Sequence, residues 1–276
     1  MPELPEVETV VNGLRPVLKG RKIIDIDVKE KNLIGYPKAE VKKFKEQLLN
    51  SKITGMGRRG KYIIINLDIK KELIIHLRMT GKLLVKEVKS FRDIHTHVIF
   101  VLDDGQEIRF NNIRKFGRIY LIDPNHPEQA GGYAELGPEP LSQDFSVEDF
   151  KKLFNNRRAI IKSLLMNQKF IAGIGNIYAD EILFLSGIKP DRTADTLNDK
   201  EKERLYYNMR EILAKGIKYG GTTFSDYVNA FGEKGTFQME LRVYQREDEK
   251  CYECGAPIKK TKIGGRSTYF CPKCQK

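Results

Sequence analysis

Short apolar runs separated by turn residues occupy the first half of the chain, a pattern typical of β-strands. A helix is predicted ahead of them, because Val7, Val10 and Leu14 recur at helical spacing. Pro16 should kink or end this helix before Gly20. The strands that follow are predicted at 23–28, 62–67, 73–77, 97–102, 107–110 and 118–122.

Two further features complete the expected first domain. The pair Asp104-Gly105 between two of the strands is a strong signal for a β-hairpin. A helix is predicted over 38–49, where apolar residues fall on one face. Short strands covered by helices indicate an α+β fold whose first part is an antiparallel β-sandwich with flanking helices.

The second half of the chain has a helical pattern. Proline, glycine and asparagine gather over 123–137, which we interpret as a domain boundary. Helices are predicted at 147–154, 159–166, 176–185 and 199–219, and Asn198 with Glu201 forms a capping box for the last one. We therefore predict three domains, over 1–133, 134–239 and 240–276.

The chain is strongly basic. Lys and Arg number 49 against 37 Asp and Glu, which leaves a formal net charge of +12. Such an excess indicates a polyanionic partner, either nucleic acid or an acidic membrane surface. The apolar runs are far shorter than the roughly 18 residues of a membrane-spanning helix, and the start of the chain does not resemble a signal peptide. We expect a nucleic-acid partner, no membrane contact, a cytoplasmic location and a monomer.

All four cysteines lie in the last 26 residues, as two Cys-x2-Cys pairs separated by sixteen residues: Cys251, Cys254, Cys271 and Cys274. Two disulfides would be the alternative in a small secreted domain. This spacing instead favours a site in which four thiolates hold one zinc ion. Four thiolates close the coordination shell, so the ion is expected to be structural.

The first residues, Met1-Pro2-Glu3, suggest a nucleophile. Methionine before a small residue is normally removed, which would free the secondary amine of Pro2. A chain-terminal amine has a pKa of about 8, so a minority is neutral and nucleophilic near neutral pH. Glu3 and Glu6 could supply acid–base catalysis beside it. In the alternative, Pro2 starts an extended segment and both carboxylates complement the helix dipole.

Several basic segments are candidates for contact with phosphate. Arg58-Arg59-Gly60-Lys61 is a basic turn between strands, Arg114 and Phe116 flank a lysine in a loop, and Gly173-Ile174-Gly175-Asn176 precedes a helix. Arg266 follows two glycines in the predicted zinc hairpin. The alternatives are a solvated turn, an ordinary core Phe116 and a plain turn between helices.

Taken together, these motifs resemble the formamidopyrimidine-DNA glycosylases, bacterial enzymes that excise 8-oxoguanine. The resemblance runs from end to end and is carried by seven segments: Pro2–Thr9 (PELPEVET), Arg59-Gly60-Lys61, His76-Leu77-Arg78-Met79, Arg114-Lys115-Phe116-Gly117, 136–141 (LGPEPL), Gly175-Asn176-Ile177-Tyr178 and 251–275. It implies an N-terminal β-sandwich, a helix–two-turn–helix domain and a zinc ribbon. It also implies a duplex DNA substrate that carries an oxidised base or an abasic site.

The resemblance assigns roles to individual residues. Pro2 would attack C1′ of the extruded nucleotide and leave an iminium, with Glu3 as acid–base group and Glu6 ordering the N-terminus; β- and δ-elimination would then open a one-nucleotide gap. Lys61 is expected to belong to the catalytic group with Pro2 and Glu3 and also to hold a phosphate. The other residues expected to contact DNA are Arg59, His76, Met79, Arg114, Phe116, Asn176 and Arg266. Among these, Met79, Arg114 and Phe116 would fill the space left by the extruded base, and Arg114 would read the orphaned cytosine.

The sequence departs from the family pattern at two places. Met79 is followed by Thr80, where the family often has glutamate. The segment expected to cover the extruded base lacks the usual arginine; it comprises Thr222, Thr223, Phe224, Ser225, Asp226 and Tyr227. Two alternatives remain, an endonuclease VIII-like glycosylase for oxidised pyrimidines and a non-catalytic zinc protein that binds damaged DNA. The first typically has glycine in place of Leu4, and the second would not need a free Pro2.

Overall fold

A computed structural model describes residues 1–276, which divide into two compact units. Unit 1 comprises Met1–Glu135 together with Tyr219–Thr236, and unit 2 comprises Leu136–Lys218 together with Phe237–Lys276. The chain therefore returns to unit 1 for one short segment before its C-terminal part. None of the helices combines the length and the hydrophobicity that a membrane crossing requires.

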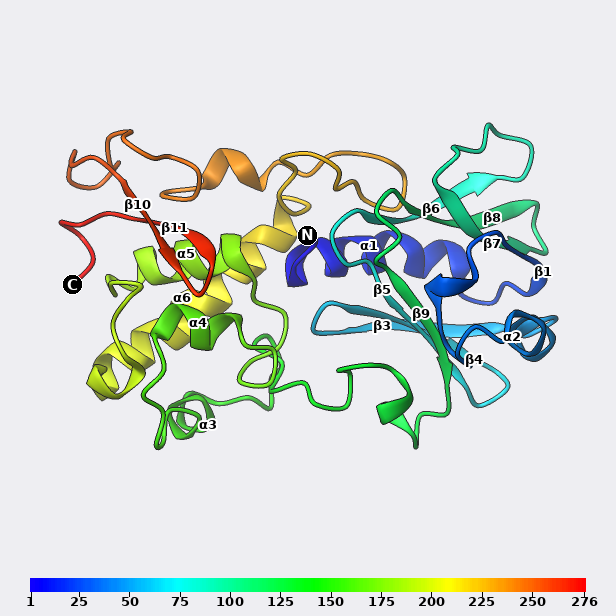
Figure 1. The fold of residues 1–276 in the computed structure, drawn as a ribbon, viewed down its shortest axis with the longest axis horizontal. Helices are drawn as coiled ribbons and strands as arrows, with labels where there is room; N and C mark the ends of the chain where they lie inside the picture. The colour runs from blue at the N-terminus through cyan, green and yellow to red at the C-terminus, as the bar shows by residue number, and fades with distance from the viewer. The chain divides into compact units, whose positions relative to one another are not determined.

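Unit 1 contains two sheets and two α-helices (Figure 1). Its elements are α1 (Leu4–Leu18), β1 (Ile23–Val28), the 3-10 turn η1 (Lys31–Leu33), β2 (Ile34–Tyr36), α2 (Val41–Leu48), β3 (Ile53–Arg59), β4 (Tyr62–Leu67), β5 (Glu72–His76), β6 (Gly81–Glu87), β7 (Thr96–Leu102), β8 (Gln106–Asn112), β9 (Arg118–Ile122) and η2 (Pro127–Gln129). One sheet has the order β1-β7-β8-β6 and the other β2-β9-β5-β4-β3. Side chains from both sheets and from α1 share one buried apolar cluster.

The β-sandwich is thus confirmed, with corrections. Three strands were not predicted: β2, β3 and β6. Gly55 and Gly57 weaken the strand signal of β3, which is an edge strand with β4 as its one neighbour in the sheet. The short β2 runs parallel to β9, so the five-stranded sheet is mixed rather than wholly antiparallel. The hairpin at Asp104-Gly105 joins β7 to β8 as predicted.

The two helices of unit 1 compare differently with the prediction. Helix α1 ends at Leu18, before Gly20 as predicted; Pro16 lies in its last turn, where a proline removes a single backbone hydrogen bond. Helix α2 starts at Val41 rather than at residue 38, since Ala39 has a left-handed φ of 57° that a helix does not accept.

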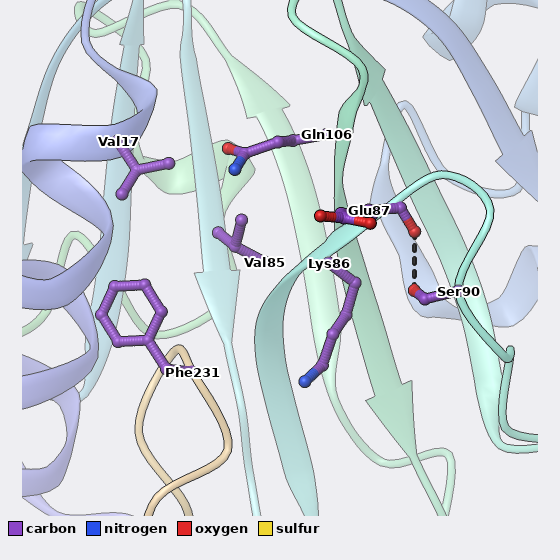
Figure 2. A pocket seen from close by; sticks show the side chains of 7 residues that line it. All are labelled: Val17, Val85, Lys86, Glu87, Ser90, Gln106 and Phe231. Carbon is purple, nitrogen blue, oxygen red and sulfur yellow. Dashed lines mark hydrogen bonds between the residues drawn. The ribbon is translucent and has the colours of Figure 1, made fainter.

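The segment Tyr219–Thr236 is attached to unit 1 beside α1 and β6. The Val85 N–H donates to the Ala230 carbonyl (3.0 Å), and a Cβ built at Gly13 of α1 would lie 3.3 Å from the Phe231 ring. A shallow pocket of about 370 Å³ remains beside this junction, with Val17, Val85 and Phe231 around its apolar part (Figure 2). None of the predicted site residues lines it.

Unit 2 is helical with a C-terminal hairpin (Figure 1). Its elements are α3 (Val147–Lys152), α4 (Ile161–Met166), α5 (Asn176–Leu185), η3 (Ala194–Thr196), α6 (Asp199–Lys218), η4 (Phe237–Glu240), β10 (Lys259–Ile263) and β11 (Arg266–Phe270). Helix α5 packs against α4, α6 and β11. The capping box at α6 is confirmed: the Glu201 N–H donates to Asn198 Oδ1 and the Asn198 N–H to Glu201 Oε2, both at 2.9 Å.

Candidate functional site

The start of the chain is buried and tied down by Glu6. Pro2 is buried, and Glu3 and Glu6 are 3% and 2% exposed. Glu3 caps α1, and its backbone N–H donates to Glu6 Oε2 (2.8 Å). The other oxygen, Glu6 Oε1, accepts the N–H of Thr222 (2.7 Å). One carboxylate therefore joins the residue after Pro2 to the segment predicted to cover an extruded base.

Two glycines and a tyrosine form the two ends of that segment, where it joins the rest of unit 1. Gly221 has a φ of +80°, and a Cβ there would lie 2.8 Å from Glu6 Cγ. The Tyr227 hydroxyl lies within hydrogen-bond distance of two carbonyl oxygens, Gly220 O (3.0 Å) and Glu6 O (3.2 Å). Burial raises the pKa of Tyr227 well above its ordinary value, so this hydroxyl remains a donor. The ends of the segment are thus fixed to α1.

The tip of the segment is more exposed. Phe224 is 46% exposed, and the Ser225 hydroxyl donates to Asp226 Oδ2 (3.3 Å). Thr223 closes the segment from within, because its hydroxyl donates to the Tyr227 carbonyl (3.1 Å) and accepts the Gly235 N–H (3.0 Å). The ends of the segment are held by hydrogen bonds, whereas its aromatic tip is exposed. The tip is therefore accessible to a ligand.

Lys61 and His76 are both buried; Lys61 lies in the turn between β3 and β4, and His76 is the last residue of β5. Gly60 turns with a φ of +56° before Lys61, and Tyr62 pairs with His76 across β4 and β5. Burial, together with the charges of Arg78 and Lys61, lowers the pKa of His76 to about 3. Its Nδ1 atom accepts the Arg78 N–H (2.9 Å), which requires a neutral ring. The buried Lys61 therefore lies near a neutral, acceptor-bearing histidine.

Met79, Arg114 and Phe116 lie close together although they come from two loops. The Arg114 guanidinium is 4.8 Å from the centre of the Phe116 ring, and its Nη1 atom is 3.2 Å from Met79 Sδ. Met79 is 43% exposed and Phe116 50% exposed. Two apolar side chains and a cation held together at the surface form an exposed wedge.

Asn176 and Arg266 belong to unit 2, where a hydrogen bond links Asn176 of α5 to the start of β11. Asn176 begins α5, and its Nδ2 atom donates to the carbonyl of Ser267 (2.9 Å), the neighbour of Arg266 at the start of β11. Arg266 is exposed. The amide of Asn176 is thus bonded to the residue that directly follows Arg266.

Three buried charged residues hold the hairpin in place, and the sequence analysis missed them. Lys162 and Asp180 form a fully buried ion pair (2.8 Å). Lys162 Nζ also donates to Ser267 O and Thr268 Oγ1, and Asp180 Oδ2 accepts the Tyr269 N–H. Burial raises the pKa of Asp180 to about 7 against the lowering effect of Lys162. The sequence offered one signal for these residues: they are charged, yet they occupy positions of α4 and α5 at which apolar core residues are expected.

The third of these residues is Glu181, which secures the chain that leads into the cysteines. It accepts the backbone N–H groups of Arg242 (2.8 Å), Val243 (3.0 Å) and Tyr244 (2.8 Å). Burial raises the pKa of Glu181, and these three donors oppose that shift. Asp180 and Glu181 together attach both sides of the cysteine-bearing module to α5.

The four cysteine sulfurs face a common centre. All four Sγ atoms lie within 4.8 Å of one another, with 3.9 Å between Cys251 and Cys274 and 3.5 Å between Cys254 and Cys271. Sulfurs bound tetrahedrally at about 2.3 Å from zinc lie about 3.8 Å apart. The residues present therefore fit one structural zinc ion with a closed shell.

Models of known families match most of the chain. Residues 1–119 match the formamidopyrimidine-DNA glycosylase N-terminal domain, and residues 136–228 match the H2TH domain of the same enzyme. Residues 248–276 match a zinc finger found in FPG and IleRS. A formamidopyrimidine-DNA glycosylase of Pelotomaculum thermopropionicum is 46% identical over 276 residues, which cover 100% of this chain and 99% of the relative. The chain belongs to the formamidopyrimidine-DNA glycosylase family.

Other members agree with this assignment at the level of sequence and fold. The enzyme of Desulforamulus reducens is 44% identical over 277 residues, with 100% of this chain and 99% of the relative covered. A crystal structure of a Lactococcus lactis FPG variant in complex with Fapy-dG-containing DNA superposes with a TM-score of 0.92 at 38% identity, over 100% of both chains. The Lactococcus lactis Fpg with abasic-site DNA gives a TM-score of 0.91 at 36% identity, over 99% of both chains.

As a formamidopyrimidine-DNA glycosylase, the chain is an enzyme of base excision repair with glycosylase and AP lyase activities. The family match and the cysteine geometry agree on one structural zinc ion. The α+β fold with a sandwich, an H2TH domain and a zinc ribbon is likewise confirmed.

Proposed function

We propose that Pro2 is the nucleophile of this glycosylase and that Glu3 moves the protons. The secondary amine attacks C1′ of the damaged nucleotide, and the bond between C1′ and the base breaks with its electron pair leaving on the base. O4′ then leaves C1′ and takes up a proton, which opens the sugar ring and forms the iminium. This cation draws electrons from the sugar, so loss of a C2′ proton expels the 3′ phosphate, and loss of a C4′ proton then expels the 5′ phosphate. Glu3 is buried beside Pro2, where a carboxyl group can exchange these protons.

One observation carries this proposal. The Glu6 carboxylate accepts an N–H from Glu3 and another from Thr222, so it joins the residue next to the predicted nucleophile to the predicted base-covering segment. Thr222, Thr223 and Tyr227 form the anchored part of this segment, whereas Phe224 and Ser225 form its tip. The exposure of Phe224 supports the proposal that its ring stacks on an extruded base.

The remaining site residues hold DNA. We propose that the DNA backbone is contacted by three residues of unit 1, Arg59, Lys61 and His76. Two residues of unit 2, Asn176 and Arg266, are proposed to contact it as well. Lys61 and Arg266 supply positive charge, whereas the neutral His76 and Asn176 supply hydrogen bonds. A site that neutralises six or more phosphates loses about a thousandfold in affinity between 50 and 200 mM salt.

Met79, Arg114 and Phe116 are proposed to fill the stack where the damaged nucleotide was. Extrusion costs a few kcal/mol, and apolar side chains that occupy the gap offset part of that cost. The Arg114 guanidinium rests on Phe116 and Met79, which presents its donors to the unpaired base opposite the gap. Cytosine, with acceptors at its O2 and N3 atoms, matches these donors.

The substrate proposed for the chain is duplex DNA that carries 8-oxoguanine, a formamidopyrimidine or an abasic site. The Lactococcus lactis structures contain Fapy-dG or an abasic site, which supports this class. We further propose that the enzyme acts as a cytoplasmic monomer. Its functional domains are proposed to be a catalytic sandwich over 1–133, a DNA-binding helical domain over 134–239 and a zinc ribbon over 240–276.

The test is covalent trapping of the iminium with borohydride. Mass spectrometry first establishes that the purified chain starts at Pro2, because a retained Met1 would convert the amine to an amide. The wild type and Pro2→Gly are then incubated with a duplex carrying 8-oxoguanine opposite cytosine. An adduct in the wild type that is lost or much weakened in the variant is expected. A chain that starts at Pro2 but forms no adduct, even on an abasic site, would refute the mechanism.

A further inference from the structure

Thr80 lies between the two loops that carry the exposed wedge of Met79, Arg114 and Phe116. Its hydroxyl accepts the backbone N–H of Arg114 (3.1 Å) and donates to Oδ1 of Asn112 (3.3 Å). A hydroxyl can accept and donate at once, whereas a methyl group can do neither. Thr80 therefore connects the turn after β5 to the loop after β8 through a side chain that has both capacities.

The loop that carries Arg114 depends on few other attachments. Lys115 has a left-handed φ of 54°, its N–H donates to the Asn112 carbonyl (3.1 Å), and its ammonium pairs with Glu30 (3.0 Å). These contacts orient Lys115, which follows Arg114. The backbone N–H of Arg114 itself is held by the Thr80 hydroxyl. Arg114 is exposed, so burial does not fix its position.

Asn112 provides the rigid end of the connection. It is 0% exposed at the end of β8 and pairs with Gly81 of β6, and its N–H donates to the His95 carbonyl (2.9 Å). Its Nδ2 atom is buried without a hydrogen-bond partner, and a Cβ built at Gly117 would lie 2.3 Å from it. The amide is thus held by packing, and it offers Oδ1 to Thr80 alone among side chains.

We infer that Thr80 is a positioning residue for discrimination of the base opposite the lesion. This inference rests on the proposed role of Arg114, because Thr80 is the group inferred to hold that arginine beside Met79. In the chain from Asn112 through Thr80 to the Arg114 backbone, each contact has a defined donor and acceptor. Loss of the middle group frees the arginine to meet several bases, while Pro2, Glu3 and the covering segment keep their contacts.

The experiment compares Thr80→Val with Thr80→Ser. Valine has the shape of threonine without the hydroxyl, and serine keeps the hydroxyl without the methyl. The readout is the ratio of kcat/KM for 8-oxoguanine opposite cytosine to that opposite adenine, guanine or thymine. We expect this ratio to fall by about three- to tenfold in Thr80→Val, the range that ordinary hydrogen bonds support, and to stay near wild type in Thr80→Ser.

Two controls separate positioning from general damage. Cleavage of a single-stranded abasic oligonucleotide, which has no opposite base, should be unchanged in Thr80→Val. An equal loss on every opposite base, or a loss that serine does not restore, would overturn the inference.

Arg114→Ala distinguishes this inference from the function on which it rests. The variant should abolish discrimination, and adding Thr80→Val to it should have no further effect. If Arg114→Ala retains full discrimination, the proposed role of Arg114 fails. If Arg114→Ala loses discrimination while Thr80→Val retains it, only the inference about Thr80 fails.

Discussion

His76 should remain uncharged in the folded protein at pH values well below its ordinary pKa of 6.5. Burial and the neighbouring charges of Arg78 and Lys61 lower its pKa from 6.5 to about 3. Its neutral Nδ1 accepts the Arg78 N–H, and protonation would replace this acceptor with a donor. We therefore predict that no ionisation near pH 6.5 belongs to this residue.

The low pKa has a defined effect on stability. The unfolded chain takes up a proton at His76 below about pH 6.5, whereas the folded chain does not do so until about pH 3. The unfolded state therefore binds more protons in this interval, and stability falls as the pH falls. Each pH unit below 6.5 costs about 1.4 kcal/mol, so acidification from pH 7 to pH 5 costs unit 1 about 2 kcal/mol through this one residue.

The variant His76→Gln isolates this contribution, because glutamine offers an acceptor oxygen but does not titrate. Hydrogen exchange of the slow amides in β4 and β5 gives the free energy of unfolding at pH 7 and pH 5 for both proteins. The decrease in the wild type should exceed that in the variant by about 2 kcal/mol. NMR of histidines labelled in the imidazole ring provides the direct check. A His76 resonance that titrates between pH 5.5 and 7.5, or equal pH dependence in the two proteins, would refute the reasoning.

Further predictions concern unit 2 and the covering segment. Chelation of the zinc ion should unfold the cysteine-bearing module and weaken DNA binding, which circular dichroism and a binding assay would report; retained affinity after verified zinc loss would contradict this. Lys162→Met should destabilise unit 2 by about 3–5 kcal/mol, because it leaves a buried carboxylate unpaired. Adding Asp180→Asn should recover part of that loss in thermal unfolding, and no recovery would rule out the unpaired charge as the cause. Gly221→Ala should slow base excision about tenfold in single-turnover assays, since its Cβ meets Glu6 at 2.8 Å, whereas Gly220→Ala, with 3.6 Å of room, should be milder; equal effects would argue against the clash.

Local patterns in the sequence were sufficient to predict most elements of this fold. Short apolar runs marked the central strands, and Asp104-Gly105 marked the β7–β8 hairpin. Where the local signal was weak the prediction failed: Gly55 and Gly57 concealed β3, and the short β2 became a strand only because β9 lies beside it. An edge strand of this kind owes its conformation to its partner rather than to its own residues.

The family motifs likewise identified the candidate site residues but not the groups that hold them. Spacing showed that two Cys-x2-Cys pairs can bind one metal ion, because four thiolates suffice for that chemistry. Nothing local indicated that Lys162 and Asp180 meet in the core, or that Thr80 reaches Arg114.

The sequence by itself therefore determined the family, the zinc ligands, the basic character and most of the strands and helices, since each follows from residue type and short-range spacing. Only the tertiary structure decided that Glu6 joins residue 3 to residue 222, that His76 is buried and neutral, and that α5 carries the carboxylates that attach the zinc module. The contacts of Glu6 with Thr222 and of Asp180 with Tyr269 join residues far apart in the chain. Their strength comes from burial, which removes competing water and so makes each hydrogen bond and charge depend on its partner.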